Sequence, residues 1–246
     1  MVRRMENLIK VALVLIAVPY VLGPVAVLIK QRFPERYALT KLDSEKFFKD
    51  QTSKFMELHL GAIRAGFTYL GCSEFSQGNV NANFSVYLDQ VDRTFCLLST
   101  FKSSLGETTQ IEFTRVYEDT SVTNVNNNAM LNVYPRHWRK ETYRFPEISD
   151  FTALLDAANR IFSLRGGERS PINIGLESGW GLVESHLNQE LDSLVERGWV
   201  SGVVRDGERR PTIKGALLMT WKLCWPVKTL LNWVDVRNAK NALDSA

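Results

Sequence analysis

The basic and aromatic residues between positions 136 and 144 form the densest group of side chains that could bind a ligand. The members of this group are Arg136, His137, Trp138, Arg139, Lys140 and Arg144. Guanidinium and ammonium groups donate charge-assisted hydrogen bonds to phosphates and carboxylates, and aromatic rings stack on bases. This composition predicts an anion site for a phosphorylated ligand, a lipid head group or nucleic acid. The alternative is an exposed loop or edge strand whose charges are solvated.

A second basic group surrounds the dipeptide Asp206-Gly207, which is a strong signal for a two-residue hairpin. It consists of Arg205, Arg209 and Arg210. Apolar residues at helical spacing predict a helix before this hairpin, over residues 176–197. The helix, the hairpin and the residues up to 216 together resemble the end of a winged-helix domain. That resemblance implies a hairpin that contacts nucleic acid through its arginines.

The charge of the predicted helix argues against nucleic acid as the partner. Its acidic residues include Glu184, Glu190, Asp192 and Glu196, and Arg197 is its single arginine. Acidic side chains repel the phosphates that dominate binding to nucleic acids. A winged-helix-like unit in this chain is therefore expected to contact protein.

Catalytic and metal-binding patterns are missing from the sequence. His59, His137 and His186 are isolated, and none has metal-ligand spacing with a cysteine or an acid. The three cysteines, Cys72, Cys96 and Cys224, form neither a disulfide framework nor a zinc pattern. The glycine-rich loops of nucleotide sites and the serine-hydrolase motif are also missing. We expect no cofactor, no metal and no catalytic residue, although distant side chains can still converge in an enzyme.

The segment Val11–Ile29 contains no charged residue. As a helix it would be about 28 Å long, close to the roughly 30 Å hydrocarbon core of a bilayer. The sequence predicts a single-pass transmembrane anchor here; the alternatives are a buried core helix and a cleaved signal peptide. Because the cysteines are unpaired, we expect the rest of the chain in the cytoplasm.

Residues 215–234 are rich in tryptophan but contain two lysines. A lysine at the centre of a spanning helix costs about 2.5–3.5 kcal/mol, so this segment is not expected to cross a bilayer. Tryptophan with lysine is typical of a helix that lies in the membrane interface. The predicted interface residues are Trp221, Lys222, Trp225, Lys228 and Trp233. Packing on the core of the protein is the alternative.

The middle of the chain predicts an α+β domain. Asp43 or Ser44 can cap a helix that runs to about Gly66, with His59 completing its apolar stripe. Alternating apolar and polar residues then predict strands over 80–88, 93–101, 109–115 and 121–125. A second helix follows, with Ser149 as its candidate cap. Short connections favour a four-stranded antiparallel meander flanked by the two helices.

These patterns divide the chain into five segments. They are a membrane anchor and juxtamembrane segment over 1–41, the α+β domain over 42–164, a linker over 165–171, a helix and hairpin unit over 172–214, and an amphipathic interfacial helix with a tail over 215–246. The expected function is that of a membrane-anchored, non-catalytic protein. Its α+β domain would bind a protein partner or a small ligand near the lipid bilayer. The alternatives are a membrane-tethered, winged-helix-like regulator that contacts nucleic acid and an enzyme that acts on a membrane-associated substrate.

Overall fold

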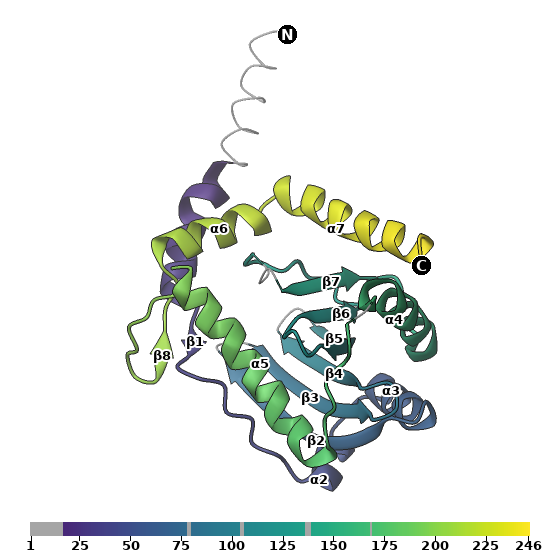
Figure 1. Cartoon of the computed structure of the whole chain (residues 1–246). Coiled ribbons are helices and arrows are strands. Elements are labelled where there is room, and N and C mark those ends of the chain that lie inside the picture. Colours follow the sequence, from purple (N-terminus) through teal and green to yellow (C-terminus); the bar gives the residue numbers. More distant parts are fainter. Residues whose placement is uncertain (1–16, 78–79, 104–105, 136–138, 168) are drawn as a thin grey trace. The chain divides into compact units, whose positions relative to one another are not determined.

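The computed structural model describes residues 17–77, 80–103, 106–135, 139–167 and 169–246 (Figure 1). The chain forms two compact units, each assembled from separate stretches of sequence. The mixed-sheet unit comprises Tyr37–Met130, Arg136–Gln189 and Val234–Ala246. The hairpin unit comprises Met1–Arg36, Leu131–Pro135 and Glu190–Trp233.

The mixed-sheet unit is built on a six-stranded sheet with the order β2-β3-β4-β5-β6-β7. Its strands are β2 (Thr68–Gln77), β3 (Val80–Asp89), β4 (Thr94–Ser103), β5 (Gly106–Val116), β6 (Val122–Asn126) and β7 (Lys140–Arg144). Neighbours are antiparallel except β6 and β7, which are parallel. The α+β class is confirmed, and strands are found at all four predicted places. The prediction of a four-stranded meander is wrong, because a strand is added at each edge.

The two additional strands lack the alternating pattern on which the prediction depended. In β2 the register shifts between Tyr69 and Gly71, and such a bulge interrupts the period of two. The sequence of β7 is Lys-Glu-Thr-Tyr-Arg, and its first four residues are all half-buried. A strand without a distinct apolar face gives no periodic signal, so neither strand could be recognised by alternation.

Three helices cover one face of the sheet: α2 (Ser44–Lys49), α3 (Ser53–Arg64) and α4 (Phe151–Gly166). The single helix predicted from residue 43 to 66 is divided in two, because the Thr52 side chain accepts a hydrogen bond from the Phe55 N–H and starts α3. Asp150, next to the predicted Ser149, caps α4. The core beneath these helices includes Phe55, Leu58, Phe113, Leu154 and Ile161, all at most 2 % exposed.

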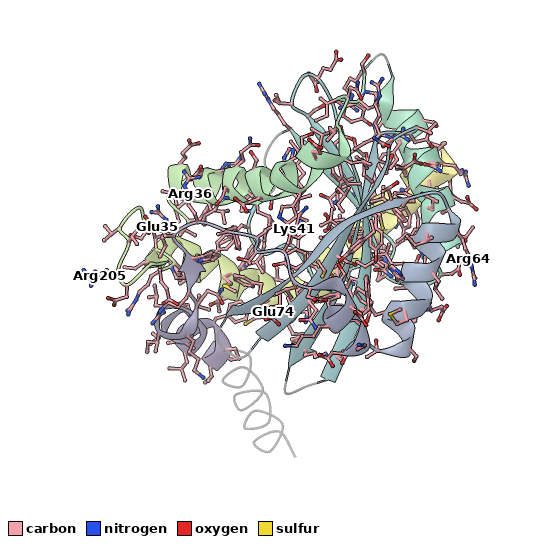
Figure 2. All side chains as sticks on the ribbon, turned by 90° about the horizontal axis from the view of Figure 1, so that it is seen from below. Glu35, Arg36, Lys41, Arg64, Glu74 and Arg205 are labelled. Carbon is pink, nitrogen blue, oxygen red and sulfur yellow. The ribbon has the colours of Figure 1, made fainter. Side chains whose placement is uncertain are left out.

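The other face of the sheet packs against the first part of α5 (Leu176–Glu196). Trp180 stacks on Phe84, with 6.4 Å between ring centroids, and donates from its indole N–H to the Leu39 carbonyl. The Lys41 ammonium lies 5.2 Å from the centroid of the Trp180 ring (Figure 2). The Glu184 carboxylate accepts a hydrogen bond from the Leu39 N–H at 2.8 Å. The acidic side of this helix therefore holds the chain segment that precedes α2.

The hairpin unit contains a small sheet in which β1 (Phe33–Pro34) pairs antiparallel with β8 (Glu208–Arg209). Asp206 and Gly207 have φ values of 55° and 75°, and Arg205 and Glu208 exchange both backbone hydrogen bonds around them. Both values lie in the left-handed region, as a type I′ turn requires. The predicted two-residue hairpin is confirmed.

The predicted helix over 215–234 is two helices. In the structure, α6 (Ile213–Leu223) is capped by Thr212, and α7 (Val227–Asp244) begins after Pro226. Proline lacks the N–H that would continue a helix, which explains the break. The part of α7 from Val234 onward belongs to the mixed-sheet unit.

Residues 17–30 are helical, and Gly23 of this helix lies close to Thr220 of α6 within the hairpin unit. Within the described ranges, no helix is both long enough and apolar enough to cross a membrane. The predicted transmembrane anchor and the single-pass localisation are therefore wrong. The described part of the predicted span, from residue 17, is about 20 Å long as a helix, well short of a bilayer core. Residues 11–16 of that span lie outside the described residues.

Candidate functional site

A groove of about 750 Å³ lies in the mixed-sheet unit, lined by β7, the end of α4 and the second half of α7. These three elements lie next to one another in Figure 1. The side chains that line the groove are mostly polar: Lys140, Glu141, Thr142, Tyr143, Arg165, Asp235, Asn238, Asn241 and Ser245. We take this groove as the candidate site.

The helical repeat of α7 directs a row of polar residues into the groove. Asp235, Asn238, Asn241 and Ser245 are spaced three or four residues apart, which places them along one side of the helix. Ala239 and Ala242 also line the groove and are only 1 % and 8 % exposed. Because alanine side chains are small, they let α7 come close to the rest of the unit.

A partly buried ion pair joins α7 to β7. The Arg144 side chain is 2 % exposed, and its Nη1 lies 3.3 Å from Oδ2 of Asp235. Its Nε and Nη2 also donate to the carbonyls of Asn128 and Ala129, at 3.1 and 3.3 Å. Arg144 was predicted to contact a ligand. In the structure its guanidinium is buried in the wall of the groove, where its partners include Asp235 and two backbone carbonyls.

The opposite wall combines a carboxylate, a phenol and a guanidinium. The Tyr143 hydroxyl donates to the Glu141 carboxylate at 3.0 Å, and Arg165 lies 3.9 Å from the same carboxylate. The Arg165 guanidinium also lies 5.7 Å from the centroid of the Tyr143 ring. Burial, followed by the charge of Glu141, raises the pKa of Tyr143, so its hydroxyl stays protonated and acts as a donor.

The structure separates the members of the basic group predicted over 136–144. Arg136, His137 and Trp138 lie outside the described residues. Arg139 donates to the Asp119 carbonyl and the Thr120 hydroxyl, at the turn between β5 and β6. Lys140 lines the groove, whereas Arg144 is buried in its wall. Among the described members, only Lys140 and Arg144 lie at the same site.

The hairpin arginines do not converge on one point. Arg205 projects from the tip of the hairpin (Figure 2), and Arg210 is exposed directly after the returning strand β8. Arg209 donates to the Gly202 carbonyl at 2.6 Å and to the Glu35 carbonyl at 3.4 Å. Its guanidinium therefore supports the hairpin. Nothing in this arrangement tests the predicted contact with nucleic acid.

The predicted interface residues lie on α6, on the connection that follows it and at the start of α7. Trp221, Trp225 and Trp233 are 48 %, 63 % and 55 % exposed. Lys228 is exposed and Lys222 is half-buried. All five belong to the hairpin unit, whereas the groove belongs to the mixed-sheet unit.

A buried polar chain that was not predicted connects α3 to β3. The Ser85 hydroxyl donates to the Tyr87 hydroxyl at 2.9 Å, and the Tyr87 hydroxyl lies 2.7 Å from Nδ1 of His59. If Tyr87 donates onward, His59 is neutral with its proton on Nε2. Burial lowers the pKa of His59, which agrees with a neutral ring. Ser85 and Tyr87 belong to β3 and His59 belongs to α3, so nothing in the sequence marked the contact between the two elements.

The residues of the groove also gave little signal in the sequence. Glu141 and Tyr143 are close to the predicted basic group, but Arg165 and the polar side of α7 are far from it in the chain. The spacing of Asp235, Asn238 and Asn241 is helical, and this pattern could have marked them as one side of a helix. In the part of the chain that the structure describes, no group of three or more His, Cys, Asp or Glu residues could hold a metal ion.

Comparison with protein-family models, with curated proteins and with solved structures gives no match for this chain. The class of protein is therefore defined by its own structure. It is an α+β protein with a six-stranded mixed sheet and a polar groove at one edge of that sheet.

Proposed function

We propose that the protein is a non-catalytic binding module whose groove takes an extended, polar segment of a partner protein. The row of polar residues on α7 supports this proposal more than any other observation. From Asp235 to Ser245 it extends over about 15 Å of helix, at 1.5 Å per residue. An extended chain rises about 3.3 Å per residue, so four or five residues of a partner would fit along it.

The side chains of the groove match the chemistry of a peptide. Asn238 and Asn241 are exposed, and each carboxamide offers both a donor and an acceptor, as a peptide group does. Lys140 and Arg165 add positive charge, whereas the carboxylates of Glu141 and Asp235 are paired with arginines of the protein. A partner segment with polar side chains and an acidic residue would find complementary groups in this groove.

The same lining supports binding over catalysis. Pockets for small molecules are predominantly apolar, whereas this groove is lined mainly by polar side chains. Its two carboxylates are engaged by arginines, Glu141 by Arg165 and Asp235 by Arg144. A general acid or base must be within reach of a substrate proton, and engaged carboxylates are poorly suited to that task. The nucleic-acid regulator and the enzyme stay predictions.

Selection of peptides from a random phage-displayed library against the full chain tests the proposal. In one variant Asn238→Ala and Asn241→Ala are combined, which removes both carboxamides from exposed positions on a helix that tolerates alanine. Asn173→Ala is the matched control, because Asn173 is also exposed but does not line the groove. We expect selected peptides to lose at least tenfold in affinity for the double variant and to bind the control as they bind the unchanged chain.

Fluorescence anisotropy with labelled peptides measures these affinities. The proposal would be overturned if the selected peptides bound the double variant as tightly as the unchanged chain. It would also be overturned if repeated rounds of selection enriched no peptide at all.

A further inference from the structure

The hairpin unit exposes many large apolar side chains on helix 17–30, on α6 and at the start of α7. We call this set the apolar face. Its members are Val18, Val21, Leu22, Val25, Ile29, Ile213, Leu217, Trp221, Leu223, Leu230, Trp233 and, on the connection between α6 and α7, Trp225, each between 39 % and 70 % exposed. Single exposed apolar residues are normal on a protein surface, and we take this concentration within one unit as the candidate for an interaction site.

The helices that carry most of this face are held together by direct contacts. The Tyr20 hydroxyl donates to the Trp225 carbonyl at 3.0 Å. A Cβ atom at Gly23 would lie 2.5 Å from Cγ2 of Thr220, so glycine is required for this close approach. Thr220 itself is 5 % exposed. The exposed residues are therefore presented by a packed pair of helices.

The charges on these segments have one sign. Residues 17–30 and 213–233 contain Lys30, Lys214, Lys222 and Lys228, and no aspartate or glutamate. Lys214 is used within the unit, where it donates to the Arg197 carbonyl and lies 4.1 Å from the centroid of the Trp199 ring. Aliphatic residues, tryptophans and lysines without acids form the composition of a surface that lies on anionic lipid.

We infer that the apolar face rests on an anionic lipid surface. The aliphatic side chains and the tryptophans would enter the boundary between head groups and acyl chains, while the exposed Lys30 and Lys228 reach the phosphates. Such a contact lies along the surface and requires no spanning helix. It concerns the hairpin unit and is independent of the peptide groove. The absence of acidic residues in the sequence of these segments favours an anionic lipid surface over a second copy of this chain.

Flotation of the full chain with vesicles of phosphatidylcholine, with or without about one third phosphatidylglycerol, tests this inference. In one variant Val21→Ser and Leu22→Ser are combined, at positions 68 % and 61 % exposed. The control is Val203→Ser, which is 62 % exposed in the same unit but lies on the hairpin. We expect the double variant to lose at least tenfold in binding to the anionic vesicles and the control to be unchanged.

The lysines provide a second measurement. Lys30→Gln combined with Lys228→Gln should weaken binding to the anionic vesicles by about 25-fold, since each exposed lysine contributes about fivefold. Binding to phosphatidylcholine alone should change little, and added salt should reduce the difference between the two lipids.

Two results would overturn the inference. One is vesicle binding that neither set of substitutions reduces, because the contact would then lie elsewhere on the chain. The other is no binding of the full chain to the anionic vesicles. A dimer, seen by light scattering, that Val21→Ser and Leu22→Ser dissociate would then assign the face to a second copy of the chain.

Discussion

Arg144 and Asp235 are 91 residues apart in the sequence, yet their side chains meet at 3.3 Å and join the edge strand β7 to helix α7. Arg144 is 2 % exposed at its side chain and Asp235 is 28 % exposed. The pair is thus partly buried, and the two carbonyls that also accept from Arg144 give its guanidinium further partners. This contact positions the row of polar residues that lines the groove.

Removing the acidic partner should destabilise the protein. Asp235→Ala leaves the buried Arg144 charge without its carboxylate, and we expect the free energy of unfolding to fall by about 2–4 kcal/mol. Asp244→Ala is the control, because Asp244 is exposed near the end of the same helix. Urea denaturation followed by circular dichroism measures both variants. Equal stability of the two would show that the pair does not hold α7 in place.

Stability should depend on pH through His59. Burial lowers its pKa below the ordinary value of 6.5, so the unfolded chain binds the proton more tightly than the folded protein. The contribution of neutral His59 to the free energy of unfolding is complete above about pH 6.5. It is lost as the pH falls through the folded-state pKa of His59. We therefore expect lower stability at about pH 5 than at about pH 7.5.

Two variants separate His59 from other titrating groups. His59→Gln cannot titrate in this range, so the difference in unfolding free energy between the two pH values should shrink. Glu147 also has a lowered pKa, but as a carboxylate it affects stability mainly below about pH 4.5. Glu147→Gln should therefore leave the difference unchanged. An unaltered pH dependence in His59→Gln would contradict the assignment.

The sequence predicted the strands with one apolar face and missed those without one. In β3, Phe84, Val86 and Leu88 alternate with residues that point to the other side of the sheet, and this pattern was sufficient. Strand β7 pairs in parallel with β6 although 13 residues separate Asn126 from Lys140, and no local pattern encodes such a pairing. Its existence depends on tertiary contacts, among them the Arg144–Asp235 pair.

The candidate site was predicted only in part, for the same physical reason. Lys140 and Arg144 belong to a local basic cluster that could be seen in the sequence, and Lys140 does line the groove. Arg165 and Asn238 come from helices distant in the chain, so only the fold brings them together. The transmembrane prediction depended on the hydropathy and length of the segment, which cannot distinguish a spanning helix from a helix that packs on a partner such as α6.

Two glycines of α5 should respond in opposite ways to alanine. At Gly181 an added Cβ meets nothing within 4 Å, so Gly181→Ala should raise the free energy of unfolding by about 0.5–1 kcal/mol through backbone entropy. At Gly179 the Cβ would lie 2.7 Å from Cδ1 of Leu70. The required movement of Leu70 should cancel or reverse the gain. Thermal denaturation compares the two variants, and equal stabilisation would contradict this account of the packing between α5 and β2.

Arg165 provides a test of the groove in which stability and binding are expected to separate. Its side chain is 45 % exposed and its ion pair with Glu141 spans 3.9 Å, so Arg165→Ala should change the free energy of unfolding by no more than about 1 kcal/mol. If the groove binds a peptide as proposed, the loss of this cation should lower the affinity of selected peptides that carry an acidic residue at least tenfold.

Arg64→Ala is the matched control for this measurement, because Arg64 is an exposed arginine at the end of α3 and does not line the groove (Figure 2). Peptides without an acidic residue should bind Arg165→Ala and the unchanged chain alike. An equal loss of affinity for all peptides would instead indicate that Arg165 maintains the shape of the groove through Glu141 and Tyr143. In that case its charge would not select the ligand, and the Asn238 and Asn241 substitutions would become the decisive test of peptide recognition.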